Sequence, residues 1–308
     1  MVSVETIAIG IYLAFVNVAA FFMYGADKRR AQRGERRIPE KTLLAIALLG
    51  GGLGAFLGMR IFHHKTRKLR FRLLVPLALV LTVIVGGGAL YFSDYYRADD
   101  VALAAAASTD VVEVCELDSG ELAFVPQGAT VGLVFYPGAK VQAEAYAPLL
   151  MRCAERGVLC VLVRAPLNFA LLDISAAREA VEQFPDIEHW VLAGHSLGGV
   201  AASEYLAGNP DASDALVLLA AYSASDVSSS DLRVLTIAGS ADGVLNRAAY
   251  EEARGNLPAG SEEIVIEGGN HAHFGNYGEQ RGDGTATISR EEQQGQTADA
   301  IVALARSL

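Results

Sequence analysis

The chain has 308 residues, of which 52% are hydrophobic, and a formal net charge of −10 at pH 7. Residues 1–72 hold 13 Lys+Arg and 4 Asp+Glu, whereas residues 73–308 hold 12 and 31. Because long apolar runs accompany the basic residues, we expect a lipid bilayer and no nucleic acid as partner. Three cysteines exclude a disulfide framework, although one bridge between Cys153 and Cys160 stays open if their domain is extracytoplasmic.

Three apolar runs lie in the first part of the chain, at residues 6–26, 43–62 and 73–92. Each has about the 20 residues that cross a bilayer core. The first run has no positive charge before it and is too long for the core of a signal peptide, so we interpret it as a true span. The sequence therefore predicts an α-helical membrane domain over residues 1–94.

Two basic segments, residues 28–37 and 63–72, flank the second run, which contains four glycines between residues 50 and 54. Loops rich in Lys and Arg stay in the cytoplasm, and both segments do so only if the second run enters the membrane and returns. Alternatively the run crosses, and its glycines pack against neighbouring helices. We favour the return. In either case residues 65–72 stay inside, which predicts a protein of the bacterial cell membrane with an extracytoplasmic soluble domain.

Four short motifs in this region resemble a small bacterial membrane domain of unknown function, number 1294. They are Tyr-Gly-Ala-Asp-Lys-Arg-Arg at residues 24–30, Arg-Ile-Pro-Glu-Lys at 37–41, Gly-Met-Arg at 58–60 and His-Lys-Thr-Arg-Lys at 64–68. The resemblance implies no activity. The basic loops either bind anionic lipid headgroups or only determine the topology, and we favour the latter.

Residues 95–110 are polar and alanine-rich, and we predict a linker there. From residue 111 to residue 308, strand-like and helix-like segments alternate. The strand-like runs are 111–115, 122–125, 131–136, 158–163, 190–194, 215–220, 233–238 and 263–266. The helix-like stretches are 142–156, 174–183, 197–207, 246–256 and 291–307. The later runs are nearly continuous in Val, Leu and Ile, which predicts an α/β domain with a doubly wound, mostly parallel sheet.

The motif Gly194-His195-Ser196-Leu197-Gly198 directly follows an apolar strand-like run and precedes a helix-like stretch. A serine on a sharp strand-to-helix turn holds its hydroxyl clear of the sheet, and the flanking glycines avoid collisions with the neighbouring strand and helix. The motif therefore predicts Ser196 as a nucleophile. We expect the tight turn to point His195 away from the reaction.

Two polar residues follow the next strand-like runs in the chain order nucleophile, acid, histidine. Asp242 lies after the run 233–238, and His271 lies after the run 263–266, so both belong to the carboxyl edge of the sheet. We predict that Asp242 orients His271, which acts as the general base. Asp226 is the alternative acid, and His273 is the alternative base.

The segment Tyr136-Pro137-Gly138-Ala139-Lys140 follows the third strand-like run and predicts an oxyanion loop. The backbone N–H groups of Ala139 and Leu197 would be its donors. Together with the motifs around Ser196, Asp242 and His271, this segment resembles the alpha/beta hydrolases, in particular the compact type related to dienelactone hydrolase and small esterases. The loop begins with Pro-Gly in place of His-Gly, the nucleophile is serine and not cysteine, and no long cap precedes Asp242.

The resemblance and the residues together predict a membrane-anchored serine hydrolase that cleaves a carboxylic ester or similar acyl compound. The triad is Ser196, His271 and Asp242, the partner is a small-molecule acyl substrate, and neither cofactor nor metal is required. Two alternatives stay open: acyl transfer to an alcohol by the same triad, and a non-catalytic membrane scaffold. The sequence names neither the substrate nor the oligomeric state.

Overall fold

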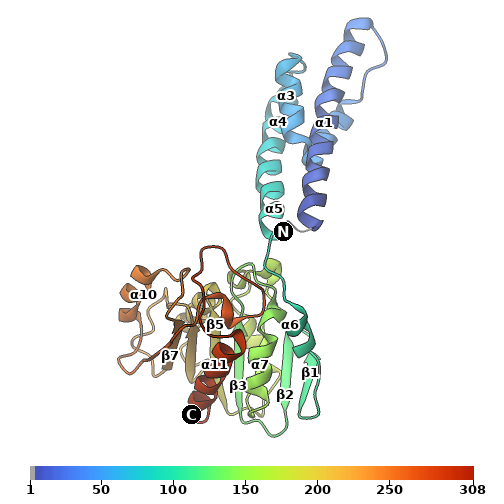
Figure 1. Cartoon of the computed structure of the whole chain (residues 1–308). Coiled ribbons are helices and arrows are strands. Elements are labelled where there is room, and N and C mark those ends of the chain that lie inside the picture. Colours follow the sequence, from blue (N-terminus) through green and yellow to red (C-terminus); the bar gives the residue numbers. More distant parts are fainter. Residues whose placement is uncertain (1–3) are drawn as a thin grey trace. The chain divides into compact units, whose positions relative to one another are not determined.

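The structure, a computed structural model, describes residues 4–308 and divides them into two compact units (Figure 1). The first unit ends at Asp94, and the second spans Tyr95–Leu308. The first unit is helical. Its elements are α1 (Val4–Arg33), α2 (Glu40–Ile46), the π-helical η1 (Ala47–Gly51), α3 (Gly52–Ile61), α4 (Leu69–Leu81), the π-helical η2 (Thr82–Gly86) and α5 (Gly87–Ser93).

Three helical stretches of the described chain are long and apolar enough to cross a membrane: Thr6–Arg33, Glu40–Ile61 and Leu69–Ser93. The second stretch is not a straight helix, because its backbone breaks at Gly50, where φ is +101° and ψ is −2°. Glycine adopts this conformation at little cost, unlike residues with a Cβ. Lys65, after α3, donates to the carboxylate of Glu40, at the start of α2, over 2.8 Å. Helices α2 and α3 therefore form a hairpin that returns to the end of the unit where it began.

The turn of this hairpin is bonded to the middle of α1. Asn17 donates its side-chain amide to the carbonyl of Gly50 at 2.9 Å and accepts the N–H of Gly54 at 2.8 Å. The hydroxyl of Thr82, from the third apolar stretch, accepts the N–H of Gly52 at 3.2 Å. Backbone groups at a helix break must find such partners inside a membrane protein. Within the first unit the chain therefore folds back at Gly50, and its path through a membrane stays a prediction.

Glycines also set the distance between α1 and α3. A Cβ on Gly54 would lie 1.9 Å from the carbonyl oxygen of Asn17, and a Cβ on Gly58 would lie 2.9 Å from Cβ of Tyr24. No atom lies within 4 Å of the corresponding position on Gly87. The glycines that suggested a break therefore also serve as the close-packing surface that we weighed as the alternative.

A buried carboxylate connects the two basic loops at one end of this unit. Asp27, which is fully buried, contacts the His64 ring at 2.7 Å and the Lys65 ammonium at 3.4 Å. It also accepts from the Arg37 guanidinium at 3.2 Å and from the backbone N–H of Ile38 at 2.9 Å. Because the hairpin returns, all 13 lysines and arginines of residues 1–72 gather at this end.

The second unit is built around one sheet of eight strands. They are β1 (Val112–Glu116), β2 (Leu122–Pro126), β3 (Val131–Tyr136), β4 (Leu159–Leu162), β5 (His189–His195), β6 (Ala215–Leu219), β7 (Arg233–Gly239) and β8 (Glu262–Ile266). The spatial order is β1-β2-β4-β3-β5-β6-β7-β8. Only the β1–β2 and β2–β4 pairs are antiparallel. The predicted mostly parallel sheet is confirmed, and each strand end lies within one residue of its predicted position.

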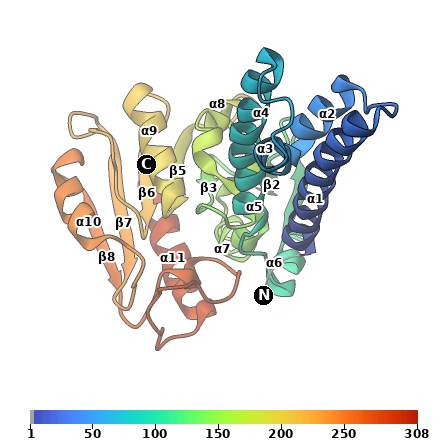
Figure 2. The same cartoon turned by 90° about the horizontal axis from the view of Figure 1, so that it is seen from above.

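Helices cover both faces of this sheet (Figure 2). The α-helices are α6 (Asp100–Ala105), α7 (Ala147–Ala154), α8 (Ala176–Glu182), α9 (Leu197–Gly208), α10 (Arg247–Ala253) and α11 (Arg290–Ala305). The short 3-10 turns are η3 (Ala143–Tyr146), η4 (Pro166–Asn168), η5 (Ala170–Leu172), η6 (Arg254–Asn256) and η7 (Ala272–Phe274). Helices α7 and α11 pack on the face that carries Leu133 and Phe135, and α8 and α9 pack on the opposite face with Val134 and Trp190. The alternation of β3 residues between two buried faces explains its uninterrupted apolar sequence.

The predicted linker at residues 95–110 is wrong. Tyr96 forms a β-bridge with Val141, and its N–H donates to the carbonyl of Lys140 at 2.7 Å. Asp99 caps α6 by accepting the N–H of Ala102 at 2.9 Å. Alanine has the highest helix propensity, and a preceding aspartate is a favourable N-cap, so the alanine-rich segment folds as part of the second unit.

The three cysteines all belong to the second unit and are free thiols. Cys153 and Cys160 are buried, and the bridge that the sequence left open between them is not formed. No group of three or more His, Cys, Asp or Glu side chains within residues 4–308 is arranged to hold a metal ion.

Candidate active site

Ser196 lies on the turn between β5 and α9, with φ of +53° and ψ of −123°. This backbone conformation is strained for a residue with a Cβ and is held by close packing on both sides. A Cβ on Gly194 would lie 2.3 Å from the backbone of Gly198, and a Cβ on Gly198 would lie 2.0 Å from the carbonyl oxygen of Tyr136. The two glycines are therefore required where the motif has them.

The backbone of Ser196 is bonded to the neighbouring strand, and its side chain is half-buried. Its N–H donates to the carbonyl of Leu219 in β6 at 2.9 Å, and its carbonyl accepts the N–H of Gly199 at 3.0 Å. Helix α9 begins at Leu197. The first N–H groups of a helix have no partner within it, and together with the helix dipole they favour negative charge at this point.

Asp242 and His271 form a buried pair at the carboxyl edge of the sheet. Asp242 accepts from Nδ1 of His271 at 2.9 Å with one carboxylate oxygen, and from the N–H groups of Val244 and Leu245, both at 2.8 Å, with the other. Burial raises the pKa of Asp242, but the hydrogen bonds from His271, Leu245 and Val244 outweigh it and lower the pKa below its usual value. Asp242 is therefore a carboxylate at neutral pH.

The bond to Asp242 also determines which His271 nitrogen carries the proton. Because a carboxylate only accepts, Nδ1 is the donor, and in neutral His271 the lone pair is on Nε2. His271 is 1% exposed, and its Nε2 has no hydrogen-bond partner among residues 4–308. The nitrogen that a general base uses is thus left unengaged.

The two alternative residues make other contacts. Asp226 is exposed and accepts the N–H of Ser228 at 2.9 Å in a local turn. The side-chain and backbone hydrogen bonds with Ser228, in this order, lower the pKa of Asp226. His273 is half-buried, and its backbone N–H donates to the side chain of Asn270 at 3.0 Å. Of the candidates, Asp242 and His271 are the pair that the structure brings into direct hydrogen-bonding contact.

The predicted oxyanion loop passes close to the turn that carries Ser196. The N–H of Gly138 donates to the hydroxyl of Tyr146 at 3.1 Å, and the N–H of Lys140 donates to the carbonyl of Asn168 at 2.7 Å. A Cβ on Gly138 would lie 3.0 Å from Nδ1 of His195. Ala139 thus lies between two residues, Gly138 and Lys140, whose backbone N–H groups already donate hydrogen bonds.

His195 does not point away as we expected. Its ring is 1% exposed and lies 4.5 Å from the His271 ring, centre to centre. Nδ1 of His195 is 2.8 Å from the hydroxyl of Tyr146, and the Phe274 ring lies 5.5 Å away. The expectation failed because the turn that exposes Ser196 leaves the preceding residue on β5, directed into the protein.

The buried hydroxyl of Tyr146 contacts the ring of His195. Burial raises the pKa of Tyr146, so the phenol keeps its proton. Its oxygen accepts the N–H of Gly138 at 3.1 Å and lies 2.8 Å from Nδ1 of His195. Burial and the nearby charge of His271 hold the pKa of His195 well below its usual value. His195 is therefore neutral at neutral pH.

Asp283, on the long loop after His271, joins the acid loop to the histidine loop. One carboxylate oxygen accepts the N–H groups of Gly243 at 3.1 Å, His271 at 3.2 Å and Gly284 at 2.8 Å. The other accepts the N–H of Ala272 at 2.8 Å. The sequence offers one signal for this residue, the unusual length of the loop that carries it.

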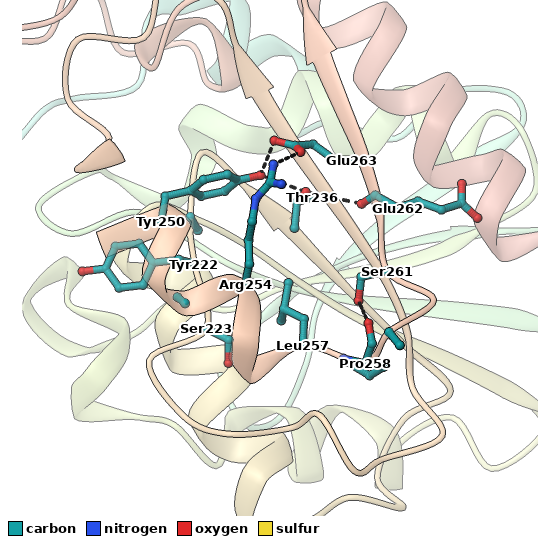
Figure 3. Close-up of a pocket in the computed structure, with 13 residues that line it drawn as sticks. Tyr222, Ser223, Thr236, Tyr250, Arg254, Leu257, Pro258, Ser261, Glu262 and Glu263 are labelled. Carbon is teal, nitrogen blue, oxygen red and sulfur yellow. Dashed lines mark hydrogen bonds and ion pairs between the residues drawn. The ribbon is translucent and has the colours of Figure 1, made fainter. Parts of the chain in front are cut away.

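A cavity of about 230 Å³ lies elsewhere in the second unit (Figure 3). Its lining includes Tyr222, Thr236, Tyr250, Arg254 and Glu263, and none of Ser196, Asp242 and His271. The Tyr250 hydroxyl donates to Glu263 at 2.8 Å, and Arg254 is ion-paired with Glu263. Because these polar groups satisfy one another, we do not assign the chemistry to this cavity.

Comparison with known proteins identifies the fold of the second unit. The family model described as "Alpha/beta hydrolase family" matches residues 132–295, which is more than half of the chain. The chain belongs to the alpha/beta hydrolase family. This membership confirms the resemblance that the sequence motifs indicated, and the fold and family are those of a hydrolase.

The N-terminal region of this alpha/beta hydrolase matches a second family model, "Protein of unknown function (DUF1294)", over residues 17–71. The chain is also similar to "Uncharacterized protein YsdA" of Bacillus subtilis (strain 168), with 42% identity over 87 residues. That match covers 28% of this chain and 96% of the relative. The second resemblance is thus confirmed.

Two solved structures are similar to this alpha/beta hydrolase. One is a predicted CIB-like hydrolase from Thermoplasma acidophilum, with 16% identity and a TM-score of 0.45, covering 62% of this chain and 97% of that one. The other is TT1662 from Thermus thermophilus, with 21% identity and a TM-score of 0.44, covering 52% and 90%. At these identities the likeness concerns the fold alone.

Proposed function

We propose that this protein is a membrane-anchored serine hydrolase that cleaves a carboxylic ester or a similar acyl compound through a Ser196–His271–Asp242 triad. The observation that carries the proposal is the buried 2.9 Å pair of His271 and Asp242, which leaves Nε2 of His271 without a partner. Ser196 supports it, because its strained turn at the carboxyl edge of the same sheet is the geometry of an exposed nucleophile.

In the proposed reaction, the Ser196 hydroxyl oxygen attacks the acyl carbon while Nε2 of His271 takes its proton. Asp242 stabilises the resulting imidazolium, and the N–H groups of Ala139 and Leu197 hold the oxyanion. The alcohol leaves with the proton from His271. Water then attacks the acyl-enzyme, gives a proton to His271 and releases the acid, and the proton returns to Ser196.

We further propose that the first unit anchors the chain with its basic end in the cytoplasm. Lys and Arg near span ends mark the cytoplasmic side, and the 13 in residues 1–72 all lie at one end of the unit. The hydroxyls of Thr6 and Ser93 are 2.9 Å apart, so α1 begins and α5 ends at the other end. The second unit would then start on the extracytoplasmic side.

Labelling with a fluorophosphonate probe tests the nucleophile. We expect the full chain to be labelled and Ser196→Ala to be unlabelled, with loss of hydrolysis of both short- and long-chain p-nitrophenyl esters. Ser203→Ala is the matched control, since Ser203 lies on the same helix α9, bonds only to the carbonyl of Val200 and should keep both signals. An unlabelled wild type, or equal labelling of Ser196→Ala, rejects the proposal. Added alcohols that yield new esters would instead indicate acyl transfer.

A further inference from the structure

A cavity of about 660 Å³ lies beside the end of α1 in the first unit. Its lining residues are Met23, Arg30, Glu35, Arg36, Arg37, Ile38 and Pro39. We propose that this cavity binds the phosphate-bearing headgroup of an anionic membrane lipid. The proposal rests on insertion of the first unit into a membrane and is independent of the proposed hydrolysis.

The charge of the cavity favours an anion. Arg37 is neutralised by buried Asp27, and Glu35 lies 3.8 Å from Arg33, which is outside the cavity. Arg30 and Arg36 are exposed and have no acidic partner in the described part of the chain. Two guanidinium groups are therefore available, and guanidinium groups bind phosphate in a bidentate manner.

The wall of the cavity is held in place without a ligand. Gly34, with φ of +71°, ends α1, and the N–H of Glu35 donates to the carbonyl of Arg30 at 3.0 Å. At the other side, Asp27 fixes the Arg37 guanidinium and the N–H of Ile38. A preformed site loses less entropy on binding than a flexible loop does.

The order of apolar and cationic residues along the wall of the cavity favours a lipid over a soluble phosphate compound. Met23 and Arg30 are seven residues apart on α1, which places them on one face of the helix about 10 Å apart along its axis. Met23 belongs to the apolar part of the span, and Arg30 belongs to the basic end. One wall therefore runs from apolar to cationic, in the order in which a lipid presents its acyl chains and its phosphate.

Native mass spectrometry of the detergent-solubilised full chain tests this assignment, with phosphatidylglycerol as the anionic probe and phosphatidylcholine as the neutral one. We expect preferential retention of phosphatidylglycerol and at least about a tenfold weaker retention by Arg30→Gln/Arg36→Gln, the effect of losing charge-assisted hydrogen bonds. Arg70→Gln/Arg72→Gln is the matched control. It removes the same charge from exposed residues at the same end, outside the cavity, and should bind like the wild type.

If both double variants retain phosphatidylglycerol equally weakly, the lipid is attracted to the basic end as a whole, and the proposal is overturned. Retention at the wild-type level in both variants would also overturn it. Equal retention of the two lipids, with displacement by millimolar inorganic phosphate, would assign the cavity to a soluble phosphate compound and overturn the lipid assignment. Carbonate-washed membranes are examined in parallel. Wild-type protein that washes off contradicts the membrane anchor itself, whereas protein that stays but shows no lipid preference contradicts only this inference.

Discussion

The carboxylate of Asp283 accepts the backbone N–H of His271 at 3.2 Å, across twelve residues of chain. The same oxygen accepts the N–H of Gly243, the residue after Asp242. One side chain thus sets the separation of the two loops that carry the proposed acid and base. A carboxylate suits this role because all its lone pairs accept, and four N–H groups converge on it.

Replacing Asp283 by asparagine should slow hydrolysis while leaving substrate affinity nearly unchanged. The amide nitrogen would face an N–H group, and the loss of charged acceptors costs about 1–3 kcal/mol. If this loss misplaces His271, kcat should fall by roughly fivefold to 150-fold. Steady-state kinetics on an ester substrate measures this. Glu279→Gln is the control, since Glu279 is exposed on the same loop and should have wild-type kcat. Equal kinetics for all three proteins would remove Asp283 from the positioning of His271.

Alanine at two glycines of α9 should have opposite effects. In Gly198→Ala the new Cβ would lie 2.0 Å from the carbonyl oxygen of Tyr136, which should lower the free energy of unfolding by about 2 kcal/mol or more. In Gly208→Ala the new Cβ has no atom within 4 Å. This substitution should leave the free energy of unfolding unchanged or raise it by up to about 1 kcal/mol. Urea unfolding followed by Trp190 fluorescence measures both, because Trp190 is the single tryptophan and is 6% exposed in β5. A stable Gly198→Ala would contradict the described turn.

The buried neutral His195 should make the second unit less stable in mild acid. The pKa of His195 is well below its usual value in the folded chain, whereas an unfolded histidine takes up a proton near pH 6.5. Below that pH the unfolded chain binds one more proton, so the free energy of unfolding falls by about 1.4 kcal/mol per pH unit as the pH decreases. Asp242, whose pKa is lowered, loses its contribution only at a more acidic pH, near and below about 3.9.

Urea unfolding of the full chain between pH 7.5 and 5, followed by Trp190 fluorescence, checks this prediction. His195→Asn should show a shallower dependence on pH than the wild type. His189→Asn, a half-buried histidine at the start of the same strand, should keep the wild-type slope. If His195→Asn also keeps it, His195 is not the neutral group that we describe.

The returning hairpin predicts that the two basic loops lie on the same side of the membrane. The first unit has no cysteine, so single cysteines at Gln32 and Arg67 report on the two loops, and one at Val4 reports on the opposite end. In intact cells, with Cys115 replaced by alanine, a membrane-impermeant maleimide should label the cysteine at position 4 and neither of the others. Different accessibility at positions 32 and 67 would mean that the second apolar stretch crosses. Labelling at 32 and 67 but not at 4 would reverse the proposed orientation.

Much of the second unit could be predicted from the sequence, because its strands are short apolar runs bounded by polar turns. The spacing of Gly194 and Gly198 and the order of Asp242 and His271 follow from steric and topological rules, and these rules hold without knowledge of the rest of the chain. The same is true of the apolar stretches in the first unit, whose length alone indicates membrane helices.

Contacts between distant polar residues could not be predicted in this way. Nothing local to Asp283 or Tyr146 distinguishes it from an ordinary loop or core residue, since each acquires its role from N–H groups and rings that are far away in sequence. Gly50 was compatible with a break and with a packing surface, and the fold at this point depends on contacts between distant residues, such as that between Lys65 and Glu40. The segment after Tyr95 was misjudged although Asp99 offered a recognisable cap for the alanines that follow it.

The hydroxyls of Thr6 and Ser93 meet at the end of the first unit opposite its basic loops. They do so because the hairpin of α2 and α3 begins and ends at the basic end. If α1 and the stretch Leu69–Ser93 each cross a bilayer once, the chain leaves the membrane on the side on which α1 begins. A domain that follows such a unit in the chain would then lie in the same compartment as the start of α1. A tag on the amino terminus would report on the compartment in which the downstream domain starts.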